Sequence, residues 1–195
     1  VILAALLSDS AEIVIKSVGV NPTRTGVIDI LQAMGANISL ENPRLLSQEP
    51  VADVRVRSSA LHGGVVDPGL VSLAIDEFPV LFVAAAAASG STQFSGIGEL
   101  RVKESDRIAA MSAGLRSLGI EVDESADGAV VHGGQFCGGD VDSFGDHRIA
   151  MSLAVAAGAA SEPVVVRDTA AVETSFPGFA ALMASLGLNI ESNTT

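Results

Sequence analysis

The chain has 195 residues, of which 48% are hydrophobic, and a formal net charge of −12 at pH 7. This length and hydrophobic content are typical of one large globular domain or two small ones. The negative charge argues against binding nucleic acid or an acidic membrane through bulk charge. Trp and Tyr are absent, whereas Ala and Gly are abundant, so we expect a core of small, closely packed side chains.

The chain has few cysteines and histidines, with one of the former and three of the latter. A single cysteine, Cys137, excludes an internal disulfide and a cysteine-rich metal site. It lies among glycines and is expected at a loop or sheet edge, with a nucleophilic role the less favoured alternative. His62 and His132 show no ligand spacing, so we expect strand or surface positions, no metal and no cofactor.

We expect neither a membrane-spanning segment nor a signal peptide. The longest apolar runs, 79–88 and 149–157, are shorter than the roughly 20 residues of a membrane-spanning helix. The N-terminus lacks the basic region of a signal peptide. It begins at Val1, without Met, inside the apolar run 1–7, which resembles a helix cut through its middle. We therefore expect a fragment of a longer chain.

In chain order, one pattern occurs three times. An alanine-rich helix is followed by a β-rich run, then by a polar loop and a second helix that closes on glycine. The expected first helices and the runs after them are 1–7 and 12–18, 79–88 and 92–97, and 148–160 and 163–167. The closing glycines, each a candidate left-handed C-cap, are Gly35, Gly119 and Gly187. The strands expected after them are 36–40 and 51–58, 120–124 and 128–132, and 188–191.

Each unit thus reads helix, strand, helix, strand, strand, which indicates a mixed α/β (α+β) fold class. Strand–helix alternation predicts parallel pairing with right-handed crossovers. The alanine-rich helices are apolar all round, as is typical of helices buried on every side. Three such units would place the helices inside and the sheets outside, with several helix N-termini opening in one direction.

Charged residues concentrate in 98–107, Gly-Glu-Leu-Arg-Val-Lys-Glu-Ser-Asp-Arg, at the start of one predicted helix. Ser105 or Asp106 can cap this helix by accepting hydrogen bonds from free backbone N–H groups. Lys103 and Glu104 would then lie in the preceding loop. A solvated charge run with local ion pairs is the plainer alternative.

The residues at two further helix starts favour an anion site. Arg107 falls in a first turn, where a cation opposes the helix dipole, so a bound anion explains it better than helix stability does. The other helix starts carry Asp76 before Pro79, and Asp146 before Arg148. For Asp146, ordinary capping of the helix is the preferred interpretation. Arginine is suited to bidentate capture of carboxylate or phosphate.

Three segments also carry a family resemblance. They are Arg-Val-Lys-Glu-Ser-Asp-Arg at 101–107, Asp-His-Arg-Ile-Ala-Met at 146–151 and Thr-Ser-Phe-Pro at 174–177. These resemble signature segments of the enolpyruvylshikimate phosphate synthase family, whose members transfer the enolpyruvyl group of phosphoenolpyruvate to shikimate 3-phosphate on the route to chorismate and the aromatic amino acids. The match covers essentially the whole chain in the family's order.

The resemblance implies a fold and an organisation. The family has two similar domains, each of three βαβαββ units in a pseudo-threefold arrangement with internal helices, which agrees with the repeat. Residues 1–19 would end the last unit of a missing partner domain, and 20–195 would form the C-terminal enolpyruvate transferase-like domain. The expected partners are the two small-molecule substrates and the missing N-terminal half, with no nucleic acid, no membrane and no cofactor. A cytoplasmic location is expected.

The resemblance also implies residue roles. Asp76 would contact shikimate 3-phosphate and accept the proton of its attacking hydroxyl, and Glu104 would protonate the methylene carbon of phosphoenolpyruvate. Lys103 would contact shikimate 3-phosphate, and Arg107 with Arg148 would bind the carboxylate of phosphoenolpyruvate. The side chains of the two arginines should then converge on a common solvent cavity, and they should not be paired with structural carboxylates such as Asp106 or Asp146. Two carboxylates held in opposite protonation states can supply both the acid and the base that such an addition needs.

Two further positions are candidates, and two alternatives remain. His147 lies inside a matching segment, and Thr174 stands where one branch of the family has lysine, so a phosphate contact there is in doubt.

A UDP-N-acetylglucosamine enolpyruvyl transferase shares the fold but lacks the segment 101–107 and uses a cysteine elsewhere, for which Cys137 is misplaced. A non-catalytic module that binds an anion is the other alternative, and it would not need the two carboxylates. Because half of the substrate ligands are missing, we expect the chain alone to be inactive.

Overall fold

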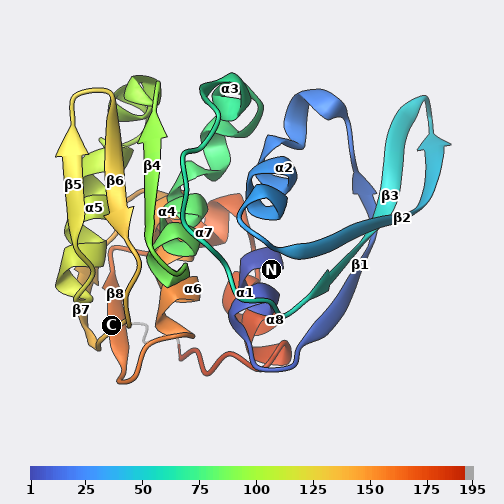
Figure 1. Ribbon diagram of the computed structural model, residues 1–195. Coiled ribbons are helices and arrows are strands. Elements are labelled where there is room, and N and C mark those ends of the chain that lie inside the picture. Colours follow the sequence, from blue (N-terminus) through green and yellow to red (C-terminus); the bar gives the residue numbers. More distant parts are fainter. Residues whose placement is uncertain (192–195) are drawn as a thin grey trace.

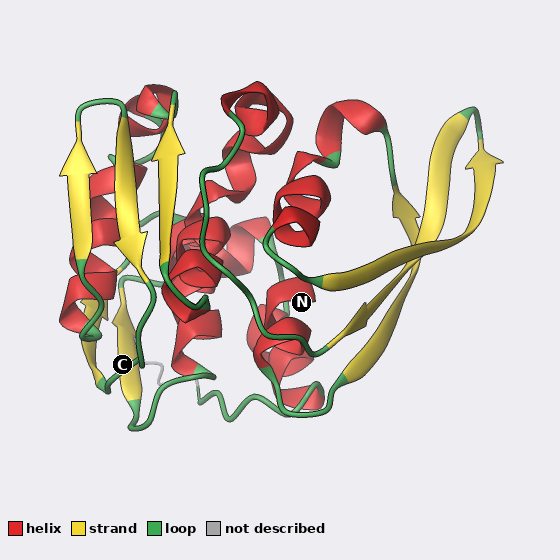
Figure 2. Cartoon of the chain, in the orientation of Figure 1, coloured by secondary structure: helices red, strands yellow, loops and turns green. Residues whose placement is uncertain are grey.

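The helices lie between two outer groups of strands in the computed structural model, which describes residues 1–191 (Figures 1 and 2). This arrangement confirms the prediction of helices inside and sheets outside. It follows from the composition of the helices, since helices without a polar face are stable only where other elements cover them.

The first unit forms a three-stranded sheet with helices on its inner side. Its elements are α1 (Ile2–Leu7), β1 (Glu12–Gly19), the 3-10 turn η1 (Pro22–Arg24), α2 (Gly26–Ala33), β2 (Asn37–Leu46) and β3 (Glu49–Arg57). The strand order is β1-β3-β2, and both pairs are antiparallel. The outer ends of β2 and β3 project from the body of the molecule as a hairpin (Figure 1).

The second unit repeats this plan with a longer helical entry. Its elements are η2 (Pro68–Leu70), α3 (Val71–Ala74), η3 (Ile75–Glu77), α4 (Phe78–Ala87), β4 (Ser91–Ser95), η4 (Gly98–Val102), α5 (Arg107–Ser117), β5 (Val122–Ser125) and β6 (Gly128–His132). The strand order is β4-β6-β5, again antiparallel throughout.

The third unit is shorter. Its elements are β7 (Gly139–Asp142), α6 (His147–Ala157), β8 (Val164–Arg167), α7 (Ala170–Ser175) and α8 (Phe179–Ser185). Strands β7 and β8 pair in parallel across α6. The strand predicted at 188–191 is wrong, because these residues have no strand conformation.

Among the strands found in residues 1–191, β7 and β8 are the pair that shows the predicted parallel pairing. In the first two units the strands joined by a crossover helix do run in the same direction, because each is antiparallel to the same third strand. That third strand, β3 or β6, returns through a short turn and inserts between them. In each of these two units, the strand that forms a hairpin with the second strand therefore occupies the position beside the first strand, where a parallel partner was expected.

Helix α4 forms the centre of the core. Most of its residues are buried, and it packs against α5 and α6. Phe94 of β4 stacks on Phe82, with ring centroids 5.0 Å apart, and meets Phe78 edge-on at 5.6 Å. Between α5 and α6, a Cβ added to Gly114 would lie 2.9 Å from Leu153 Cδ2, so a larger residue would have to displace the Leu153 side chain.

Residues 1–19 belong to the same core as the rest of the chain. Leu3 and Leu6 of α1 are buried in it, and α1 contacts β3 and α4. Strand β1 pairs with β3 from Glu12 to Gly19. The division at residue 19 stays a prediction about a longer protein, but within this chain the segment is integral to the fold.

One helical stretch, Pro68–Ala87, is long and apolar enough by length and composition to cross a membrane. It consists of η2, α3, η3 and α4 in succession, and 56% of its most apolar window is buried inside the molecule. It is the central core helix with its entry turns, and burial in a protein core accounts for its composition.

Candidate active site

The candidate site is built at three helix starts, as the sequence predicts. Helix α5 begins at Arg107, and the N-cap Asp106 accepts a hydrogen bond from Ala109 N–H at 3.0 Å. Helix α6 begins at His147, and the N-cap Asp146 accepts one from Arg148 N–H at 2.9 Å. The third start places Asp76 in η3, immediately before α4.

Arg107 is the centre of the site. Its side chain is only 1% exposed, and its guanidinium contacts three carboxylates. Nε donates to Asp146 Oδ2 at 2.8 Å, Nη1 to Asp76 Oδ1 at 3.3 Å and Nη2 to Glu104 Oε2 at 2.6 Å. Opposite charges and satisfied donors are what allow a guanidinium to be buried at all.

Arg148 and Arg107 both contact Asp76. Its Nη1 donates to the main-chain oxygen of Asp76 at 3.0 Å, and its Nη2 lies 3.5 Å from Asp76 Oδ2. Glu77 Oε1 is 4.0 Å from the same Nη1. The two arginines are far apart in sequence yet contact one carboxylate, so the predicted convergence is confirmed.

One part of that prediction is wrong. We expected both guanidinium groups to face a common solvent cavity, free of structural carboxylates such as Asp106 and Asp146. Asp106 does pair elsewhere, with Arg101 at 2.7 Å, but Asp146 binds Arg107 directly. Because the Asp146 carboxylate is itself 0% exposed, it needs a buried cation, and Arg107 is the one in reach.

Asp146 is the residue that sequence reasoning underestimated, since we expected only a helix cap. It also accepts a hydrogen bond from Ser105 Oγ at 3.1 Å. Burial by itself would raise the pKa of Asp146, but the hydrogen bonds from Arg107, from Arg148 N–H and from Ser105 outweigh burial and lower it. The signal in the sequence was an acid at the start of an apolar helix, which capping alone seemed to explain.

The other predicted residues lie outside this contact network in the part of the chain that the structure describes. Lys103 forms an ion pair with Glu99, one helical turn earlier. His147 is half-buried at the first position of α6, and Thr174 is exposed on α7. None of the hydrogen bonds found within residues 1–191 joins their side chains to Arg107 or Arg148.

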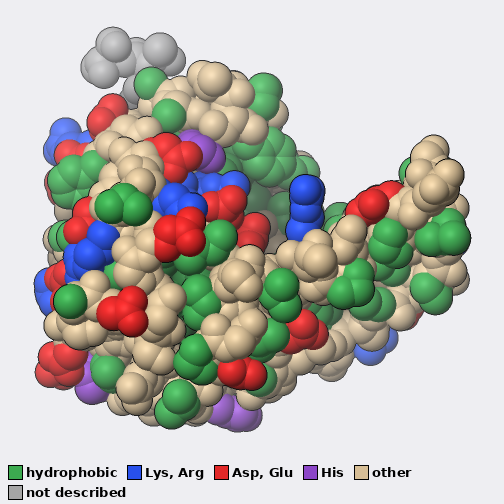
Figure 3. All heavy atoms as spheres, turned by 90° about the horizontal axis from the view of Figure 1, so that it is seen from above, with side chains coloured by type: hydrophobic (Ala, Val, Ile, Leu, Met, Phe, Trp, Pro, Cys, Tyr) green, Lys and Arg blue, Asp and Glu red, His purple; other side chains and the backbone are tan. Residues whose placement is uncertain are grey.

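The site presents carboxylates to solvent and keeps its central cation inside. The side chains of Asp76 and Glu104 are 46% and 55% exposed. Burial raises the pKa of Glu77, the nearby Arg148 lowers it and Asp76 raises it, with an increase as the net result. Figure 3 shows acidic and basic side chains interspersed on one face, beside the notch next to the projecting hairpin. Two accessible carboxylates flanking fixed guanidinium groups can exchange protons with a bound anion.

A second group of charged side chains lies away from this site. Glu121, Asp123 and His132 place their potential metal-ligating atoms within 4.8 Å of one another. The spacing of these residues in the sequence shows no ligand motif, but the hairpin of β5 and β6 brings His132 opposite Glu121.

Comparison with known proteins identifies the family. A family model described as EPSP synthase (3-phosphoshikimate 1-carboxyvinyltransferase) matches residues 1–183. The chain belongs to the EPSP synthase family. Curated 3-phosphoshikimate 1-carboxyvinyltransferases are similar to it: that of Nitrosococcus oceani is 52% identical over 188 residues, and that of Methylococcus capsulatus is 53% identical over 189.

These matches cover 96% and 97% of this chain but only 42% and 43% of the two relatives. A solved EPSP synthase from Acinetobacter baumannii superposes with a TM-score of 0.96 at 44% identity, over 99% of this chain and 45% of that one. The chain thus spans less than half the length of the EPSP synthases that it matches. The enolpyruvyl transferase NikO from Streptomyces tendae shares the fold, with a TM-score of 0.74 at 19% identity, over 100% of this chain and 43% of that one.

Proposed function

We propose that this chain supplies one wall of the active site of an enzyme that transfers the enolpyruvyl group of phosphoenolpyruvate to the 5-hydroxyl of shikimate 3-phosphate. The observation that carries the proposal is the convergence of Asp76, Glu104, Arg107 and Arg148 at three helix starts. Binding an anion needs only the cations. Two exposed carboxylates on either side of a buried guanidinium add an acid and a base.

The chemistry divides between the two carboxylates. Glu104, in its protonated form, gives a proton to the methylene carbon of phosphoenolpyruvate while the hydroxyl oxygen of the acceptor bonds to the adjacent carbon. Asp76 takes the hydroxyl proton. In the resulting tetrahedral adduct, the Glu104 carboxylate takes back a proton from the new methyl group while the carbon–oxygen bond to phosphate breaks, which restores the double bond, and Asp76 returns its proton to the leaving phosphate. In both the addition and the elimination, each of the two carboxylates transfers one proton to or from a substrate atom.

The arginines would hold phosphoenolpyruvate, whose methylene carbon accepts the proton of Glu104. Arg107 and Arg148 would bind the carboxylate of phosphoenolpyruvate, and Lys103 would contact shikimate 3-phosphate. Without ligand, the outward Nη1 and Nη2 of Arg107 are bonded to Asp76 and Glu104. A substrate carboxylate would replace one of them, which frees that side chain for proton transfer and leaves Asp146 to fix the guanidinium through Nε.

The experiment uses a chimaera in which this chain replaces the matching segment of the Nitrosococcus oceani relative. We expect phosphate release that requires both substrates. Asp76→Asn and Glu104→Gln should each lower kcat by about 10²–10⁴-fold, the usual contribution of a positioned acid or base. Asp29→Asn, an exposed position on α2, is the matched control and should leave kcat unchanged.

Two results would contradict the proposal. An active chimaera whose Asp76 and Glu104 variants keep full turnover would remove these residues from the chemistry. A folded chimaera that binds phosphoenolpyruvate without releasing phosphate would favour a non-catalytic anion-binding module. Circular dichroism and cooperative unfolding of each variant separate these results from misfolding.

A further inference from the structure

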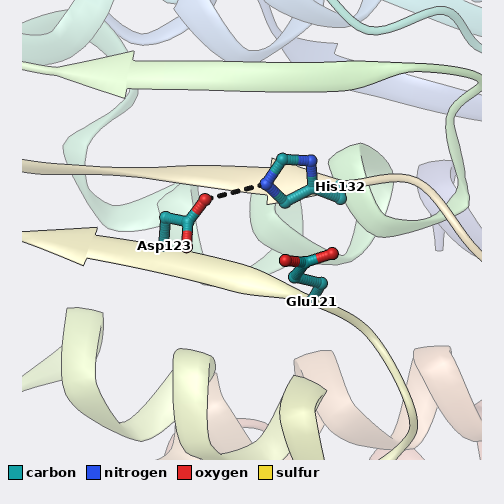
Figure 4. Close-up of side chains that lie close together, drawn as sticks. All are labelled: Glu121, Asp123 and His132. Carbon is teal, nitrogen blue, oxygen red and sulfur yellow. Dashed lines mark hydrogen bonds and ion pairs between the residues drawn. The ribbon is translucent and has the colours of Figure 1, made fainter.

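Three side chains converge on the outer face of the β4-β6-β5 sheet, away from the candidate active site. They are His132 at the end of β6, Asp123 on β5 and Glu121 just before β5 (Figure 4). One ligand atom from each lies within 4.8 Å of the others. Glu121 and Asp123 are exposed, and His132 is half-buried, so solvent and ions reach the group.

The backbone fixes the relative position of the three residues. The His132 N–H donates to the Glu121 main-chain oxygen at 3.0 Å, which places these two residues opposite each other. Asp123 follows Glu121 by two residues along the chain, and side chains two apart on a strand share a face. The group therefore rests on paired backbone and not on a flexible loop.

The imidazole of His132 is held from both sides. Ser91, its direct partner across the β4–β6 pair, lies with Oγ 2.9 Å from Nδ1. Nε2 lies 2.9 Å from Asp123 Oδ2. A second partner on the far ring nitrogen is the usual way in which metal-ligating histidines are oriented, and here it turns Nε2 toward the carboxylates.

The charges around His132 are unbalanced. Within the described part of the chain, the ion pair of Asp123 is with His132, and the Glu121 carboxylate has no ion pair. The basic side chains that contact this hairpin are engaged elsewhere: Arg116 bonds Glu124 and the Val122 oxygen, and Arg101 bonds the Ser125 oxygen. Two carboxylates therefore surround one imidazole without a neighbouring fixed cation.

We propose that Glu121, Asp123 and His132 form a binding site for a transition-metal dication of the Zn²⁺ class. One imidazole nitrogen and carboxylate oxygens are ligands that Zn²⁺ accepts, whereas Mg²⁺ and Ca²⁺ prefer oxygen alone. Zn–ligand bonds of about 2.0–2.1 Å require ligand atoms about 3.3–3.5 Å apart. Small side-chain rotations close the group to this size, and water fills the remaining position. The ion would join β5 to β6 on the outside of the sheet.

The test is a calorimetric titration with Zn²⁺ alone. The protein carries Cys137→Ser, so that the exposed thiol does not compete for the ion. We expect one ion per chain at micromolar concentration. His132→Ala and the isosteric Asp123→Asn should each weaken binding at least about tenfold, the scale seen when metal-site contacts are lost. His62→Ala, which removes an exposed histidine outside the group, is the matched control and should bind as before.

The proposal fails if the parent protein takes up no Zn²⁺ up to millimolar concentration. It also fails if His132→Ala or Asp123→Asn binds with unchanged affinity, or if His62→Ala removes the binding. Thermal unfolding without metal checks that every variant is folded. Should His132→Ala not fold, Asp123→Asn decides, because its amide keeps the shape of the side chain and the contact to the imidazole.

Discussion

At the scale of single residues, the site depends on how Arg107 is held. Its three nitrogens point to three different carboxylates, an arrangement that only the planar fork of a guanidinium can serve at once. The bond to Asp146 lies inside the protein, and the other two reach the surface. One half of the side chain is thus structural, and the other half is available to a ligand.

This division predicts the effect of Arg107→Lys in the chimaera. A lysine keeps the charge but presents a single ammonium, so it cannot hold Asp146 and a substrate carboxylate together. We expect KM for phosphoenolpyruvate to rise at least about tenfold, or about 1.4 kcal/mol, with KM for shikimate 3-phosphate nearly unchanged. Steady-state kinetics with each substrate varied in turn would show it. Arg24→Lys, exposed in η1, is the control, and an equal rise in both KM values would assign Arg107 to support of the domain.

A second prediction at this scale concerns Asp146 and pH. Its pKa is lowered in the folded protein, so its charge stabilises the fold above the unfolded pKa of about 3.9 and is lost as pH falls through the folded value. Asp146→Asn keeps a cap but leaves Arg107 without its buried partner, and should cost roughly 3 kcal/mol at pH 7.

Urea unfolding of the two proteins between pH 7 and pH 3 would measure this difference. The gap in unfolding free energy should narrow on acidification, because the unsubstituted protein then loses the same charge. A gap that is constant over this range would mean that Asp146 acts through its shape and not through its charge.

The sequence predicted which residues meet but not how they pair. Asp76, Glu104, Arg107 and Arg148 converge as expected. The buried bond between Arg107 and Asp146 could not be foreseen, because a capping residue at a helix start already has a sufficient local explanation. Which carboxylate is buried depends on how closely α5 packs against α6, and a local sequence pattern does not predict the distance between two helices.

At the scale of elements, the composition of α4 determines the architecture. A helix with no polar face must be covered on all sides, and alanines allow its neighbours to come close. Ala84, Ala85 and Ala86 are fully buried, as predicted. Ala87 is only half-buried, and it borders a hollow of about 420 Å³ with residues of α1 and the segment 58–61, so the prediction for this position is wrong.

The two alanines make a matched pair of substitutions. Ala85→Leu would force three additional carbon atoms into a filled interior and should lower the unfolding free energy by about 1–3 kcal/mol. Ala87→Leu, with the same added volume on the same helix, can extend into the hollow and should cost less than about 0.5 kcal/mol. Chemical denaturation of both variants would measure the difference, and equal losses would contradict the assigned burial.

Element types were easier to predict than strand pairing. The three closing glycines have φ values of 93°, 84° and 96°, as left-handed C-caps require. The hairpin of β2 and β3 was underestimated, because its turn uses Ser47 and Gln48 at positive φ where Gly or Asn is the usual signal. The order of the strands depends on which strand pairs beside which in the sheet, and hydrophobic periodicity does not contain that information.

At the scale of the whole molecule, the balance of charges indicates that the site lacks cations for its substrates. Four carboxylates, those of Asp76, Glu77, Glu104 and Asp146, surround the two arginines. Together with the two arginines, these carboxylates leave the wall no net positive charge to offset the negative charge of two phosphorylated substrates. The chain spans less than half of its relatives' length, and further cations for the substrates would have to come from the remainder.

We therefore expect the 195-residue chain alone to release no phosphate from the two substrates together. A coupled assay of inorganic phosphate would test this, with the chimaera as the positive control. Robust turnover by the chain alone would show that this wall is sufficient and would contradict the half-site interpretation.

The central stretch Pro68–Ala87 has a consequence for the chain before it folds. Asp76 and Glu77 are the charged residues of this otherwise uncharged stretch, and they stand near its middle. An acidic residue at the centre of a spanning helix costs about 2.5–3.5 kcal/mol for insertion into a bilayer, and charges that flank apolar runs also limit aggregation. The acidic pair therefore opposes membrane insertion of the newly synthesised polypeptide, and its first member is the residue that we assign to proton transfer. Replacing both with amides would be expected to reduce the yield of soluble protein as well as its activity.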